Sequence, residues 1–131
     1  MPEKLGNAAL LFGAIAAVPS IWQTIGHITD ETYRVAGDRL GERHAQYHMA
    51  REALITLGAF GTIATGAAAG SARSPQLWRA MAWAAGGFAA ALWSGGPAIG
   101  EWSPNRGALI SHIASTAGLG IGVALLRPRR G

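Results

Sequence analysis

The sequence predicts an all-α integral membrane protein, built as a single up-down bundle of four transmembrane helices. Half of its 131 residues are hydrophobic and only 14% are charged, against roughly 25% charged in a typical soluble domain. Lys, Arg, Asp and Glu are absent from four windows of at least 20 residues each: 5–29, 53–72, 80–100 and 107–126. A helix needs about 20 residues to cross the hydrocarbon core of a bilayer. Too few residues are left for a soluble core, so we expect one transmembrane domain over 1–131.

The composition also excludes several classes of protein. The 19 glycines and the many alanines keep the mean hydropathy at +0.21, but small residues let membrane helices approach closely. The absence of cysteine excludes disulfides, Cys-ligated zinc and iron–sulfur clusters. The net charge of +4 comes largely from arginines at the ends of the apolar segments, which favours contact with lipid headgroups over nucleic acid. We therefore expect the lipid bilayer as a partner and no nucleic acid.

The first span is predicted over about residues 5–27. Pro19 is expected to kink this helix or to end its regular part. Glu3 lies beside Lys4 and the apolar run continues to Trp22, which is unlike the basic start and short apolar core of a secretory leader. We therefore expect a transmembrane span here and not a cleaved leader.

The second span is predicted over about residues 50–70, at the end of a longer helix. No proline occurs between Glu42 and Gly70, and a continuous helix of that length would extend about 43 Å. The hydrocarbon core is only about 30 Å thick, so the first turns of this helix are expected to project beyond it. Thr29 or Asp30 is expected to cap a short helical turn in the preceding polar stretch.

The third and fourth spans are predicted over about residues 77–94 and 108–126. The short connections favour antiparallel neighbours, and an even number of spans puts both termini on the same side. The Arg-bearing second connection near Arg73 and the basic tail over 127–130 indicate that this side is cytoplasmic. We expect a multi-pass protein of the cell membrane with both termini in the cytoplasm.

The four histidines stand where this topology brings them to one face of the membrane. His27 ends the first span, His44 and His48 precede the second, and His112 follows the third connection. These positions share one end of a four-span bundle. The residues best suited to acid–base or ligand chemistry are therefore expected to gather there.

His44 and His48 are four residues apart and share one helical face, which Arg51 and Glu52 extend by a turn. Ionisable groups at the bilayer boundary usually face a cavity or a partner. We predict a site that binds or transforms a small hydrophobic or quinone-like ligand. His48 and Glu52 would carry protons as the catalytic pair, and Arg51 would anchor an anionic group. The other predicted ligand-binding residues are His27, His44 and His112.

Two cofactor interpretations stay open beside this one. His44 and His48 could chelate one metal ion, with His27, His112 or Glu52 completing the ligand set. A bis-histidine haem would need His48 and His112 on facing helices at similar depth. The cofactor, if there is one, is not identified by the sequence, and neither is enzymatic activity.

Two further interpretations need no ligand. The histidines and their neighbours are also typical of an interfacial helix start with snorkelling polar side chains. Alternatively, the chain is a non-catalytic packing or assembly subunit of a larger membrane complex, or forms a homo-oligomer. Gly66-x-x-x-Gly70 and Gly118-x-Gly120-x-Gly122 are candidate close-contact faces for such association.

The motif His44-Ala45-Gln46-Tyr47-His48 resembles one found in a group of small uncharacterised four-span membrane proteins. Members of that group carry a His-Ala-basic-aromatic-His motif between their first two spans, and a Trp-bearing third span similar to that around Trp83 and Trp93. The general layout also resembles that of the DoxX-like small four-helix membrane proteins. Gly41-Glu42-Arg43 replaces a Pro-rich lead here, and Gln46 replaces the basic residue. The resemblance implies a four-helix membrane fold and marks His44 and His48 as site residues.

Overall fold

The computed structural model describes residues 1–128, and its regular elements are all helical within that range. Residues 129–131, which include Arg129 and Arg130 of the predicted basic tail, lie outside the described residues. Four long helices, two short 3-10 turns and one short helix follow in the order α1 (Pro2–His27), η1 (Glu31–Tyr33), α2 (His44–Ala68), η2 (Gly70–Ala72), α3 (Pro75–Trp93), α4 (Gly95–Ile99) and α5 (Arg106–Leu125). The prediction of an all-α protein is confirmed.

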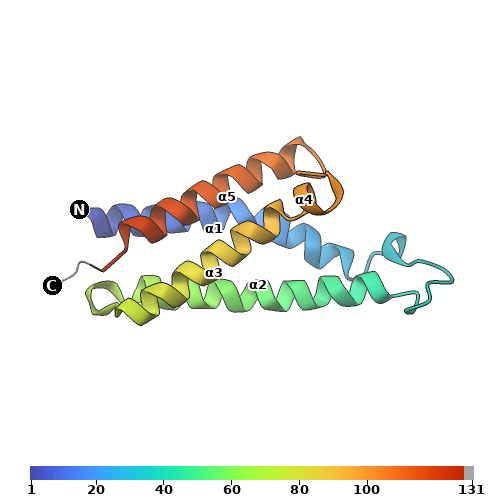
Figure 1. Cartoon of the computed structure of the whole chain (residues 1–131), viewed down its shortest axis with the longest axis horizontal. Coiled ribbons are helices and arrows are strands. Elements are labelled where there is room, and N and C mark those ends of the chain that lie inside the picture. The colour runs from blue at the N-terminus through green and yellow to red at the C-terminus, as the bar shows by residue number, and fades with distance from the viewer. Residues whose placement is uncertain (129–131) are drawn as a thin grey trace.

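The four long helices run alternately up and down (Figure 1). The N-terminus, the turn between α2 and α3 and the end of α5 lie at one end of the molecule, and the other two connections lie toward the opposite end. Helix α5 packs most extensively on α1, and α3 packs on both α2 and α5. The ends that carry the four histidines therefore all point toward the connection between α1 and α2.

Polar side chains fix the starts of several elements. The Ser74 hydroxyl accepts a hydrogen bond from the Leu77 N–H, and the Asn105 side chain accepts one from the Ala108 N–H, which are N-caps of α3 and α5. The Asp30 carboxylate caps the 3-10 turn η1 in the same way, as the sequence predicted. The expectation that Pro19 ends the regular part of the first helix is wrong, because α1 continues to His27. Pro19 lies on the exposed face of α1, where its ring displaces no packed neighbour.

Glycines make the crossing of α1 and α5 close. A Cβ atom at Gly118 would lie 2.6 Å from the Cα of Gly13, and one at Gly122 would lie 2.6 Å from Leu10. Gly120 faces open space. Two of the three glycines in the predicted contact face of α5, Gly118 and Gly122, therefore permit close packing against α1 within the chain.

The buried Arg73 side chain joins the ends of two helices far apart in sequence. Its guanidinium donates to the carbonyl oxygens of Gly66 and Ala67 near the end of α2, and to that of Leu126 after α5. Carbonyls in the last turn of a helix lack partners within the helix and carry its negative dipole end. One arginine thus satisfies three such oxygens and ties α2 to α5 at the end opposite the histidines.

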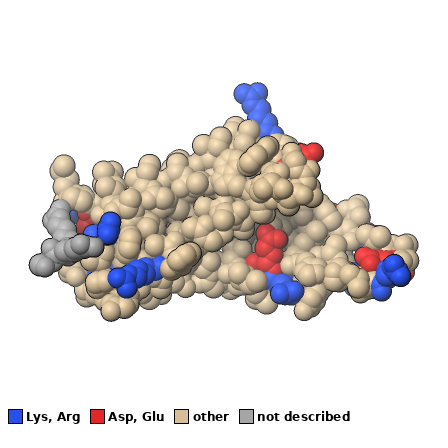
Figure 2. Space-filling model, in the orientation of Figure 1, with Lys and Arg blue, Asp and Glu red and all other residues tan. Residues whose placement is uncertain are grey.

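By length and apolar composition, α1 and α5 qualify as membrane-spanning helices, whereas α2 and α3 do not. Many large apolar side chains are nonetheless exposed on all four long helices, such as Phe12, Leu57, Trp83 and Ile113. Figure 2 shows a largely uncharged surface between the two ends, and a hollow with acidic atoms beside it.

Candidate functional site

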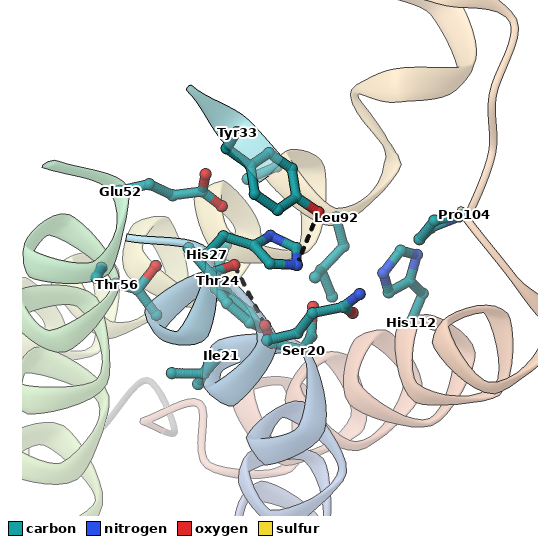
Figure 3. Close-up of a pocket in the computed structure, with 14 residues that line it drawn as sticks. Ser20, Ile21, Thr24, His27, Tyr33, Glu52, Thr56, Leu92, Pro104 and His112 are labelled. Carbon is teal, nitrogen blue, oxygen red and sulfur yellow. Dashed lines mark hydrogen bonds between the residues drawn. The ribbon is translucent and has the colours of Figure 1, made fainter. Parts of the chain in front are cut away.

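A cavity of about 300 Å³ lies among the long helices on the side of the histidine-bearing ends. Its lining residues come from α1, α2, α3 and α5, from η1, and from the connection before α5, which contributes Pro104 (Figure 3). Helix α1 supplies Ser20, Gln23 and Thr24 one to two turns before His27. The apolar part of the wall comes from Ile21, Ala53, Phe88, Ala91 and Leu92. The lining thus combines apolar side chains with several polar groups, which is typical of small-molecule sites.

His27 and Tyr33 are two polar residues that line the cavity and contact one another. The Tyr33 hydroxyl lies 2.9 Å from Nε2 of His27, and the two ring centroids are 4.2 Å apart. The Gln46 amide donates to the Asp30 carbonyl over 3.0 Å, which fastens the segment that carries Tyr33 to the start of α2. The connection between α1 and α2 therefore contributes directly to the site.

His112 reaches the cavity from the second turn of α5 and is only 6% exposed. Its ring packs edge to face against Trp93, with centroids 5.6 Å apart. Trp93 is itself held by a 2.9 Å hydrogen bond from its indole N–H to the Thr116 hydroxyl. The buried Nδ1 atom of His112 has no hydrogen-bond partner among the described residues. A buried polar atom without a partner is costly, and among the residues with such an atom in the described part of the chain, His112 is the one that lines the cavity.

Glu52 lines the same cavity from α2, one turn before Thr56. Within the described residues its carboxylate has no ion-pair partner, unlike Glu31 and Glu42 in the connection before α2. The adjacent Arg51 turns away, and its guanidinium lies 5.6 Å from the centre of the Tyr47 ring. The structure therefore leaves Glu52 facing the cavity without the arginine expected beside it.

His44 and His48 do not line this cavity. Their Nε2 atoms are 3.0 Å apart on an exposed face of α2. Side chains lean toward the N-terminus of a helix, and His48 leans back on His44, away from Glu52. The structure thus brings together His27, Glu52 and His112 but leaves out His44, His48 and Arg51. The expected His48–Glu52 catalytic pair is not assembled in this arrangement.

The ligand sets expected for a metal or a haem are not assembled either. Within residues 1–128, no group of three or more His, Asp or Glu side chains is arranged to hold a metal ion. His48 lies outside the cavity that His112 lines, so these two do not face one another across a haem site. Metal binding by the His44–His48 pair alone stays a prediction.

The outer part of the connection between α1 and α2 is held by charge pairs. The Arg34 guanidinium lies 2.5 Å from the Glu42 carboxylate and 3.5 Å from that of Glu31, and these contacts raise the pKa of Arg34. Hydrogen bonds from the Thr32 hydroxyl and N–H lower the pKa of Asp30. The carboxylates in this segment are therefore engaged with their neighbours, in contrast to Glu52.

Sequence reasoning did not identify Tyr33 as a site residue, nor the hydroxyl and amide side chains that accompany His27 on α1. The polar residues Ser20, Gln23 and Thr24 recur at helical spacing before His27, so the signal for a polar face on α1 was present. No comparable signal existed for Tyr33, because its position depends on the fold of the connection.

Comparisons with family models, with curated proteins and with solved structures gave no match for this chain. The resemblance to the DoxX-like proteins and to the group with the His-Ala-x-aromatic-His motif therefore stays a prediction.

Proposed function

We propose that this protein spans the membrane with four helices and binds a small lipophilic ligand in the cavity beneath Tyr33. The ligand would place a hydrogen-bonding head group near His27, Glu52 and His112 and its apolar body against Phe88 and Leu92. A quinone-like molecule is one member of this class. The observation that carries the proposal is the cavity lining itself, in which His27, Glu52 and His112 stand together with the apolar Phe88 and Leu92.

The exposed apolar surface supports the membrane part of the proposal. Leu57 of α2 is 70% exposed and Trp83 of α3 is 81% exposed, although these helices are the less apolar ones. Soluble monomers rarely expose contiguous apolar surface of this extent, whereas lipid covers it in a membrane. Helix α2 is longer than a hydrocarbon core of about 30 Å. Its polar first turns would therefore lie at the boundary between lipid and water.

The cavity supports ligand binding through its size and its donors. A volume of about 300 Å³ lies at the lower end of the range of about 300–1,000 Å³ for small-molecule sites. The Tyr33 hydroxyl, the Gln23 amide and the His112 ring offer hydrogen bonds to a head group. Proton transfer to a bound ligand would fall to Glu52 and the histidines of the cavity.

Mass spectrometry of molecules that co-purify with the full-length protein tests this proposal. We expect Ala53→Phe to fill the cavity and to remove the bound lipophile, because Ala53 lines the wall. The matched control is Leu54→Phe, since Leu54 is 70% exposed and lies outside the lining. Equal amounts of every co-purifying molecule in the two variants would contradict ligand binding in this cavity.

A second candidate function is association with another membrane helix. Gly86 and Gly87 of α3 have no atom within 4 Å of the Cβ position, and the exposed Trp83 lies one turn before them. Small residues on a free face permit close approach of a second helix. Gly87→Leu should then release a partner in mild detergent, and an unchanged elution profile would contradict this function.

A further inference from the structure

The charges around the cavity distinguish one class of ligand from another. Glu52 is the carboxylate that lines it, and no lysine or arginine is among its lining residues within the described part of the chain. The predicted anionic anchor, Arg51, contacts the Tyr47 ring instead. With neutral histidines, the wall therefore carries one formal negative charge and no fixed positive charge.

Aromatic groups accompany this carboxylate. Tyr33 and Phe88 both line the cavity, and Figure 3 shows Glu52 and Tyr33 directed toward the same space. The His27 ring stacks near Tyr33, which holds the phenol in place. Glu52 is exposed, whereas Tyr33 is half-buried and Phe88 is buried. A carboxylate beside aromatic rings is the arrangement that recognises ammonium groups, through ion pairing and cation–π attraction.

We propose that the cavity selects a lipophilic cation, with an ammonium head group beside Glu52 and Tyr33 and an apolar body among Ile21, Phe88 and Leu92. This inference rests on the proposed ligand-binding function and specifies the charge of the ligand. The head group of such a ligand would pair with Glu52, whose carboxylate has no ion-pair partner among the described residues. An anionic ligand would meet the carboxylate without a compensating cation.

Binding of three small probes to the full chain in phosphatidylcholine nanodiscs tests the proposal. The probes are benzyltrimethylammonium, benzyl alcohol and benzenesulfonate, measured by equilibrium dialysis against empty nanodiscs. We expect saturable binding of the ammonium probe, at least about tenfold tighter than that of the other two, since ion pairing with Glu52 and cation–π attraction together contribute about one order of magnitude.

Two charge variants test whether Glu52 causes the preference for the ammonium probe. Glu52→Gln should weaken binding of the ammonium probe by about tenfold or more, and it removes no ion pair or hydrogen bond described in the structure. The matched control is Glu3→Gln, which makes the same change of charge in the first turn of α1, outside the cavity lining. Glu3→Gln should bind like the wild type, and circular dichroism should show equal helix content in all three proteins.

The failures of the two proposals are distinguishable. Equal binding of the ammonium probe to wild type and Glu52→Gln would overturn the cation assignment, as would preferred binding of benzyl alcohol or benzenesulfonate. Absence of ammonium binding would also overturn the cation assignment. If a co-purifying lipophile is nevertheless lost only in Ala53→Phe, the proposed ligand site stands, and its ligand belongs to a neutral class such as the quinones. If no probe binds and Ala53→Phe retains every co-purifying molecule, both proposals are wrong.

Discussion

Replacement of Gly118 by alanine tests the packing that holds α1 and α5 together. The new Cβ atom would lie 2.6 Å from both the Cα and the N of Gly13, and 2.8 Å from the Ala9 carbonyl oxygen. All three of these atoms belong to the backbone, so no side-chain rotation relieves the contact. Carbon atoms pack at about 3.5–4.0 Å, and the two helices would have to separate by about 1 Å.

The cost of that separation sets the size of the effect. Extra methyl groups in a packed core typically cost about 1–3 kcal/mol. Alanine at a free helical position instead gains up to about 1 kcal/mol over glycine from helix propensity. Gly120, two residues further on the same helix, has no atom within 4 Å of its Cβ position, so Gly120→Ala is the matched control. Because this propensity gain is common to both variants, we expect them to differ by the packing cost alone, about 1–3 kcal/mol in the free energy of unfolding.

Unfolding in mixed micelles, with sodium dodecyl sulfate as denaturant and circular dichroism as readout, measures this difference. Gly118→Ala should unfold at lower denaturant than wild type, and Gly120→Ala at equal or higher denaturant. Equal midpoints for the two variants would refute the reasoning, because α1 and α5 would then not cross at Gly118.

Two further predictions concern the ends of the molecule. Arg73→Gln should lower the free energy of unfolding by about 3 kcal/mol, because three carbonyl oxygens lose a charged donor. The control Arg79→Gln, at an exposed position, should change the free energy of unfolding little. Equal effects of the two variants in the same micelle assay would contradict the contact by which Arg73 joins α2 to α5. At the opposite end, the lowered pKa of Asp30 means that its cap stabilises the folded connection above pH 3.8, the ordinary value for this carboxyl, and is lost as the pH falls through the lower folded value. The protection factor of the Thr32 N–H against hydrogen exchange should therefore fall at acidic pH in wild type and be low at every pH in Asp30→Ala, and pH-independent protection in wild type would contradict this role.

The helices and their order could be predicted from the sequence because they depend on long charge-free runs and on local caps. The predicted second helix begins within a few residues of His44, and the predicted connections fall where the structure has them. Of the two outcomes expected at Pro19, the end of the regular helix is contradicted, because α1 continues to His27, while the kink stays a prediction.

The site could be predicted only as far as topology alone determines it. The helix ends that carry His27 and His112 meet because the chain passes up and down, so this part of the prediction agrees with the cavity lining. The directions of His48 and Arg51 depend on rotamers and on neighbours such as Tyr47, which spacing along a helix does not determine. Tyr33 enters the cavity through a connection held by Gln46, a contact that no periodic pattern encodes.

Cysteine labelling in nanodiscs tests the central claim most directly, namely that lipid covers the outer face of α2 while its cavity face is open to water. The chain has no cysteine of its own, so single variants can be compared with a small water-soluble thiol reagent. Thr56 lines the cavity, and the neighbouring Leu57 is 70% exposed on the outer face. We expect rapid modification of Thr56→Cys and slow modification of Leu57→Cys. Equally rapid modification of both positions, or an inert Thr56→Cys, would contradict this claim.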